Sequence, residues 1–250
     1  MEINDLSPWL LLVAPVIIVI GYTVFGLSGF GSTVISVPVL AHFLPVSYLV
    51  PLMALLDLAS ATLVGTAGRE HVARPEMKRI IPWMFVGFVV GVTLLKGVPD
   101  EYLRTALGIF AMSMGMYSIF NPTLLRTISA WWSVPVGIIG GAVATVFGAG
   151  GPIYSTYLSG RLKDKTEIRA TMSALISISA FTRAIIYAVT GLMLHTAIFA
   201  GFVVLAPFVW MGLKLGDRIH VGLSQEQMRR AIGCVLVLTG GSLLVRLFVA

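Results

Sequence analysis

The chain has 250 residues, of which 57% are hydrophobic and only 11% are charged, and its mean hydropathy is +0.94. This composition excludes an ordinary soluble domain and is typical of a protein embedded in a lipid bilayer. The net charge of +6 does not indicate nucleic-acid binding, because the basic residues lie in short segments between apolar blocks, and the single cysteine, Cys234, excludes disulfide frameworks and cysteine metal clusters.

Ten apolar blocks follow one another, and no stretch between them is long enough for a separate soluble domain. They cover residues 9–28, 31–43, 46–67, 80–95, 105–120, 131–148, 151–160, 170–190, 197–213 and 231–249. The segment before the first block contains Glu2 and Asp5 but no basic residue, which is unlike a cleavable signal peptide and predicts a retained first helix. We therefore expect an all-α polytopic membrane protein with a single membrane domain over residues 1–250.

Two of these blocks, 31–43 and 151–160, are too short to be ordinary membrane spans. Each follows a glycine cluster, GLSGFGS at 26–32 and VFGAGGP at 146–152. The similarity suggests an internal repeat. At an offset of 122, Phe25, Gly26 and Gly29 match Phe147, Gly148 and Gly151. At an offset of 125, Pro82, Gly87, Gly91, Arg104, Ala106, Gly108 and Gly115 match Pro207, Gly212, Gly216, Arg229, Ala231, Gly233 and Gly240. The chain is predicted to be duplicated, with repeat 1 at about 8–120 and repeat 2 at about 131–249.

The distribution of Lys and Arg predicts how the two repeats are oriented. If each broken block crossed the membrane as one span, the basic residues would divide six against ten between the two sides. If each broken block instead turns back at its glycines, thirteen lie inside and three outside, which the positive-inside rule prefers. We therefore expect inverted repeats, each with a glycine-broken re-entrant hairpin followed by three transmembrane helices, and both termini outside.

Broken helices inside a membrane must line a cavity or be buried in protein, because lipid cannot satisfy free backbone groups. Each break is followed by a helix whose first turn presents free N–H groups and the positive end of a dipole, which attract anions. Glycine allows close backbone approach, Pro152 suits the first helical position, and hydroxyl groups add donors. The predicted substrate-binding residues are Ser28, Gly29, Gly31, Ser32, Thr33, Gly148, Gly150, Gly151, Pro152 and Arg183. The alternative is that the glycines only allow close helix packing.

Two ionisable residues, Asp57 and Arg183, lie inside long apolar blocks, where a charge needs a partner or water. At the 122 offset, Asp57 matches Ser179 and Arg183 matches Ala61, each about one helical turn from the other's equivalent. The two side chains could therefore face one another. One interpretation is a purely structural ion pair; the other is that Arg183 balances an anionic substrate while Asp57 binds a proton or positions Arg183.

The motifs GLSGFGSTVISVPVL and VFGAGGPIYSTYLSGR, in the duplicated layout, resemble the TauE/SafE family of sulfite and organosulfonate exporters over nearly the whole chain. The resemblance implies a bacterial or archaeal plasma-membrane carrier for small sulfur oxyanions or related organic anions. The first motif has serines where many members have denser glycine runs.

The sequence thus predicts a secondary transporter of a small anion, such as sulfite, working by alternating access and coupled to protons. No Walker A motif is present, and neither a cofactor nor a metal is expected. The expected partners are the substrate and the lipid bilayer, with a homo-oligomer left open. The alternatives are a passive anion channel and an intramembrane enzyme. The enzyme is disfavoured because GLSGF lacks the G-x-S-x-G pattern, and neither His42 nor His195 lies deep within a helix.

Overall fold

A computed structural model describes residues 8–28, 31–64, 69–120, 128–218 and 225–249. These residues form ten α-helices. The helices are α1 (Pro8–Ser28), α2 (Ser32–Leu40), α3 (Val46–Val64), α4 (Arg74–Gly97), α5 (Asp100–Phe120), α6 (Ser133–Phe147), α7 (Gly151–Arg161), α8 (Lys165–Val189), α9 (Thr196–Arg218) and α10 (Gln225–Val249). The expected all-α polytopic membrane fold is confirmed.

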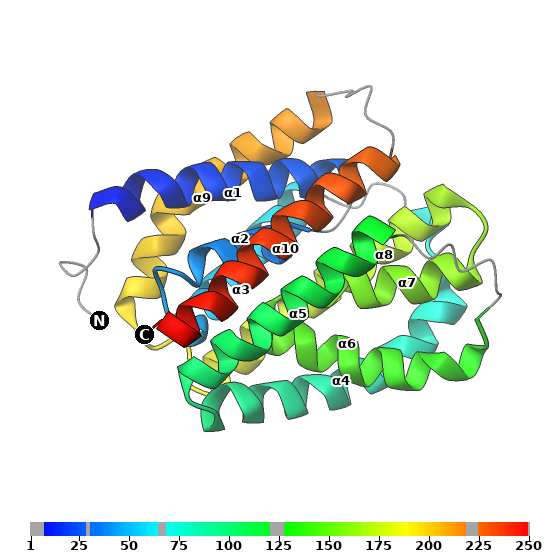
Figure 1. Ribbon diagram of the computed structural model, residues 1–250. Coiled ribbons are helices and arrows are strands. Elements are labelled where there is room, and N and C mark those ends of the chain that lie inside the picture. The colour runs from blue at the N-terminus through cyan, green and yellow to red at the C-terminus, as the bar shows by residue number, and fades with distance from the viewer. Residues whose placement is uncertain (1–7, 29–30, 65–68, 121–127, 219–224, 250) are drawn as a thin grey trace.

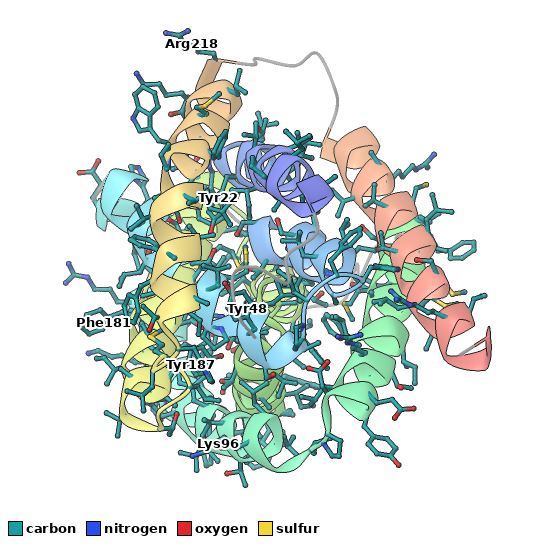
Figure 2. The ribbon with its side chains drawn as sticks, turned by 90° about the vertical axis from the view of Figure 1, so that its left-hand side faces the viewer. Tyr22, Tyr48, Lys96, Phe181, Tyr187 and Arg218 are labelled. Atoms are coloured by element: carbon teal, nitrogen blue, oxygen red, sulfur yellow. The ribbon has the colours of Figure 1, made fainter. Side chains whose placement is uncertain are left out.

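Among the described residues, five segments are long and apolar enough to cross a membrane, and α1 and α3 add shorter apolar stretches. The five are Arg74–Gly97, Asp100–Phe120, Ala130–Phe147, Thr166–Val189 and Thr196–Arg218. Large apolar side chains are exposed on the outer helices, for example Val89, Ile109 and Val203. Such a surface suits contact with lipid acyl chains. In Figure 2, Phe181 and Arg218 lie at the margin of the molecule, whereas Tyr22 lies inside it.

The short helix α2 lies in the centre of the bundle, because almost all of its side chains are buried. Neighbours from both halves of the chain surround it in Figure 1. A helix of nine residues is about 14 Å long and cannot cross the hydrocarbon layer alone. Its apolar burial instead anchors the first glycine break inside the protein.

One end of the bundle joins segments that simple hydropathy would separate. Glu76 near the start of α4 pairs with Arg161 at the end of α7, at 2.8 Å. The Ala73 amide donates to Thr171 Oγ1 of α8 at 2.9 Å. We call this the basic end, defined by residues 69–79 and 157–171. Segments 69–79 and 160–169 therefore lie at the same end of the molecule.

The opposite end holds the turns that follow α2, α4 and α8. The Val46 amide donates to the Asp100 carboxylate at 2.7 Å, and Lys96 donates to the Thr190 carbonyl at 3.0 Å. Arg246 near the end of α10 donates to the His42 carbonyl. In Figure 1, α1 begins and α10 ends on the same side of the molecule, the left.

Helices α5 and α10 pack directly through glycines and run antiparallel, as Figure 1 shows. A Cβ atom added to Gly115 would lie 2.7 Å from the Gly233 carbonyl oxygen, and one added to Gly240 would lie 2.8 Å from that of Gly108. The 125 offset converts each of these contacts into the other. If the broken blocks were single spans, α5 and α10 would run in the same direction.

The repeat offsets also relate the packing of α4 on α6 to the packing of α9 on α1. A Cβ atom on Gly91 would lie 2.6 Å from Thr145 Cβ, and one on Gly216 would lie 2.7 Å from the Thr23 carbonyl oxygen. Gly91 matches Gly216 at the 125 offset, and Thr23 matches Thr145 at the 122 offset. A helix of each repeat thus packs on the first helix of the other, which supports the duplicated and inverted layout.

Candidate functional site

Helix α1 ends at Ser28 and α2 begins at Ser32, and α6 ends at Phe147 and α7 begins at Gly151, so the two predicted breaks fall between separate helices. Gly31 precedes α2 with a φ of 115°, and Gly148 follows α6 with a φ of 71°. Both angles lie in the region that L side chains rarely adopt, so glycine is required there. Ser28 is the last residue of α1, whereas the predicted site residue Gly29 lies outside the described residues.

The second break is built by close packing. A Cβ atom on Gly150 would lie 2.7 Å from the Gly140 carbonyl oxygen of α6. Gly151 is the first residue of α7 and is buried. Pro152 is therefore the second helical residue rather than the first, as the sequence had suggested, but its missing N–H still falls where a helix leaves amides unpaired. Gly150 thus serves close approach, not a left-handed turn.

The two breaks touch one another. A Cβ atom on Gly148 would overlap the side-chain methyl of Thr33, which lies in the first turn of α2. The same atom would lie 3.5 Å from Arg183 Nη1. Predicted site residues from both halves of the chain therefore meet at one place, beside the buried arginine.

Asp57 of α3 and Arg183 of α8 form a buried ion pair, with Oδ2 and Nη2 3.1 Å apart and side-chain exposures of 3% and 2%. The sequence left open whether the two residues pair directly, and in the structure they do. Burial of each charge alone would be costly, and pairing with further hydrogen bonds offsets that cost.

The Asp57 carboxylate accepts hydrogen bonds from three hydroxyl groups as well. Tyr22 of α1 donates to Oδ1 at 2.8 Å, and Ser32 donates to the same oxygen at 3.0 Å. Thr33 lies 3.4 Å from Oδ2. Because Ser32 and Thr33 begin α2, the carboxylate lies at the positive end of that helix dipole. The anion at the N-terminus of α2 is thus the carboxylate of Asp57, a group of the protein itself.

Arg183 connects this anion to the second break. Its Nη1 donates to the Ala144 carbonyl oxygen at 3.0 Å, in the last turn of α6. A cation is favoured there, at the negative end of the α6 dipole. Arg183 Nε is buried and has no hydrogen-bond partner among the described residues, and the same holds for the hydroxyl of Tyr154 in α7. Two buried donors beside the ion pair, Arg183 Nε and the Tyr154 hydroxyl, therefore have no acceptor among the described residues.

A second polar cluster closes the basic end, with the nearly buried Glu76 at its centre. Glu76 pairs with Arg79 at 2.6 Å and Arg161 at 2.8 Å, and it accepts a hydrogen bond from the Tyr157 hydroxyl at 2.6 Å. The cluster ties α7 to α4. Sequence reasoning interpreted these basic residues only as orientation signals and missed the ring around Glu76.

Sequence reasoning also missed Tyr22, since a tyrosine in an apolar block resembles a packing residue. The repeat alignment offered a signal for Tyr22, because Tyr22 matches Ala144 at the 122 offset. These equivalent positions supply the partners of Asp57 and Arg183, one through a side chain and the other through a backbone carbonyl. Among the described residues, no group of three or more His, Cys, Asp and Glu side chains could hold a metal ion.

Comparison with known proteins gives a family and one informative relative. The family model described as "Sulfite exporter TauE/SafE" matches residues 13–243. A protein of Comamonas testosteroni named "Probable inner membrane transporter protein TsaS" is 25% identical over 193 residues, covering 77% of this chain and 81% of that relative. No solved structure matches the chain.

Proposed function

Because the chain belongs to the sulfite exporter TauE/SafE family, we propose that it is a secondary transporter of a small sulfur oxyanion or organosulfonate, such as sulfite. The family and the name of the relative point to a membrane transporter rather than an enzyme. The proposed location is a bacterial or archaeal plasma membrane, with both termini outside.

The observation that carries this proposal is the meeting of the two breaks at a buried guanidinium. Arg183 lies between the first turn of α2 and the last turn of α6, where Thr33 and Gly148 touch. A guanidinium presents several N–H donors in a planar fork that suits oxyanions. Backbone amides at the start of a helix add donors of the same kind. The proposed substrate is therefore an oxyanion small enough to enter a site between helices.

Alternating access is the proposed mechanism. In inverted-repeat carriers, one repeat rocks against the other around a central site, so that the site opens to each side in turn. The reciprocal glycine contacts of α1 with α9 and of α4 with α6 support such a layout here. Residues 8–120 and 131–249 would be the two repeats.

Proton coupling is the final part of the proposal, with Asp57 as the group that exchanges the proton. It is the carboxylate that contacts Arg183, and intramembrane carboxylates commonly act in proton relays. The proposal involves lipid and substrate as partners, and a homo-oligomer is compatible with it.

The test is a binding screen followed by flux in proteoliposomes. Sulfite, thiosulfate and methanesulfonate are titrated against the purified protein by calorimetry, with chloride as the control. Uptake of the anion that binds is then measured under an imposed pH gradient. Concentrative uptake supports the carrier; flux that only equalises concentrations identifies a passive anion channel. Failure of all three anions to bind would refute the proposed substrate class.

A further inference from the structure

The donors around the Asp57 carboxylate form an anion site that the protein itself fills. The carboxylate receives Arg183 Nη2 and the hydroxyls of Tyr22, Ser32 and Thr33, and it lies at the start of α2. Three of these four residues, Ser32, Thr33 and Arg183, are among the residues predicted to bind the substrate. A substrate anion that uses them must take the place of the carboxylate.

We infer that the substrate anion binds only when Asp57 is protonated, so that one proton and one anion cross the membrane together in the same direction. This inference rests on the proposed transport function and adds the sense of the coupling. It makes Asp57 an internal substitute for the substrate.

Electrostatics at the site exclude the simultaneous presence of both negative charges. Arg183 supplies the only cationic side chain that contacts Asp57 among the described residues, and both side chains are almost fully buried. Two anions sharing one buried cation repel strongly, as two carboxylates in one site do. Protonation removes the charge of Asp57, leaves Arg183 with a net positive charge, and converts one carboxyl oxygen from an acceptor into a donor.

The other ionisable groups near the pair do not compete for this proton. Tyr22 of α1 interacts with Asp57, Tyr154 of α7 interacts with Arg183, and Tyr187 of α8 interacts with Arg183 first and with Asp57 second. Tyrosine and arginine keep their protonation state under conditions where a carboxyl group exchanges its proton. The proposed proton is therefore assigned to Asp57, the carboxyl group that contacts Arg183.

Unused donors indicate that the site can hold more than a carboxylate. Arg183 Nε and the Tyr154 hydroxyl are buried without a partner among the described residues. Unsatisfied buried donors are uncommon in folded proteins and often mark a bound water or ion. A sulfonate or sulfite has three oxygen atoms, one more than a carboxylate, and so has an additional acceptor for such donors.

Linkage fixes the direction of coupling. If protonation of Asp57 promotes anion binding, the bound anion must equally promote retention of the proton. Loss of the proton on the other side restores the Asp57–Arg183 pair and expels the anion. Proton and anion thus move together, whereas an exchanger would require each to displace the other.

The first test measures binding of methanesulfonate, whose charge is constant over the range used, by calorimetry. For the wild type, Kd should rise about tenfold for each pH unit above the midpoint of Asp57 protonation, the slope for one linked proton. Asp57→Asn should bind with a Kd that changes less than about twofold between about pH 5.5 and about pH 8. Glu76→Gln is the matched control, because it also converts a buried, ion-paired carboxylate into an amide but lies in the other cluster; it should keep the wild-type slope.

If Asp57→Asn fails to fold, proton uptake by the wild type still tests whether anion binding requires a proton. Calorimetry in buffers of different ionisation enthalpy should give about half a proton bound per anion at the midpoint, and about one proton per anion well above it. Binding that is independent of pH, or that releases protons, overturns the inference but leaves the proposed substrate class intact. Absence of binding by every protein at every pH contradicts the proposed function instead.

The second test measures flux in wild-type proteoliposomes with methanesulfonate on both sides at equal concentration. Acidifying the outside should drive net uptake and alkalinising it should drive net exit. The opposite response would identify a proton exchanger and overturn the inferred sense of coupling, although anion transport itself would stand.

Discussion

Arg183 joins three helices through single hydrogen bonds, since its guanidinium contacts Asp57 of α3 and Ala144 of α6 from its own position on α8. The same contacts can serve two roles, one structural and one functional. The structural part is charge neutralisation, which removal of both partners can preserve. The proposed functional part is binding of the substrate oxyanion by a planar fork of donors, which only arginine supplies.

These two parts can be separated by mutation. Arg183→Gln leaves the Asp57 charge buried without its cation and should lower stability by about 3–5 kcal/mol, measured as thermal unfolding in detergent. Asp57→Asn combined with Arg183→Gln should recover most of that loss, because no charge remains. The double variant should nevertheless fail to bind the anion in calorimetry, and Arg183→Lys should retain only weak binding. Near-native affinity of the double variant would show that Arg183 serves stability alone.

Two tyrosines of α7 offer a matched comparison of a used and an unused hydroxyl. Tyr157 donates to Glu76 at 2.6 Å, whereas the Tyr154 hydroxyl has no partner among the described residues. Tyr157→Phe should therefore cost about 1.5–3 kcal/mol of stability, the range for a hydrogen bond to a charged group. Tyr154→Phe should be neutral or stabilising in the anion-free protein. Equal losses for the two variants, measured by thermal unfolding, would contradict the assignment.

The elements that define the site are the two short helices and the turns before them. Thr33 in the first turn of α2 packs against Gly148, which lies between α6 and α7, and this contact leaves no room for a side chain at Gly148. The elements are therefore fixed to each other by contact as well as by charge.

A rescue experiment tests this contact. Gly148→Ala adds a methyl group that overlaps Thr33 and must adopt a positive φ, so transport should fall at least about tenfold and stability by about 1–3 kcal/mol. Adding Thr33→Ser removes the overlapping methyl and keeps the hydroxyl, so part of the loss should return. Gly241→Ala is the control, because nothing lies within 4 Å of its added Cβ. Without any recovery in the double variant, the steric contact would not be the cause.

Gly→Val at Gly31 and at Gly150 extends the same reasoning to each break separately. Gly31 has a φ of 115°, and Gly150 approaches the Gly140 carbonyl oxygen, so valine is strained at one and obstructed at the other. If these breaks serve transport, membrane abundance should largely survive while flux is abolished. Full flux by both variants, with normal abundance on immunoblots, would exclude the breaks from the site.

Hydropathy predicts the helices well and their ends poorly. The seventh block, predicted at 151–160, is the helix Gly151–Arg161. By contrast, α4 begins at Arg74 rather than at residue 80, and α8 begins at Lys165 rather than at 170. Charged residues at a membrane surface continue the helix but lower the mean hydropathy, so the pattern ends before the helix does.

Some features of the candidate site could likewise be predicted from the sequence, and others could not. A charge inside an apolar block is visible in the sequence, so Asp57 and Arg183 could be singled out in advance as residues that could face one another. The acceptor at Ala144 is a backbone carbonyl, which every residue has, and it depends only on the way α8 packs against α6. The carboxylate at the start of α2 was likewise hidden, because the register of α3 against α2 decides it.

At the scale of the whole molecule, the topology has a direct test. Residues 70 and 163 belong to the same end of the bundle, and residue 101 belongs to the other. Single cysteines at Glu70, Lys163 and Glu101, with the exposed Cys234 replaced, should be labelled by an impermeant thiol reagent in two groups. The first two should be protected in intact cells and the third accessible. Opposite accessibility of positions 70 and 163 would contradict the inverted layout.

The packing of α1 on α9 also has a consequence for biosynthesis. Gly26 contacts Gly216, so the first helix finds its partner only after most of the chain has left the ribosome. At about 5–20 residues per second, the intervening 190 residues take about 10–40 s to make. During that time α1 lies in the membrane without α9, and the first glycine break has only part of its final surroundings. We therefore expect the nascent chain to depend on the insertion machinery or on lipid to shield this break until translation is almost complete.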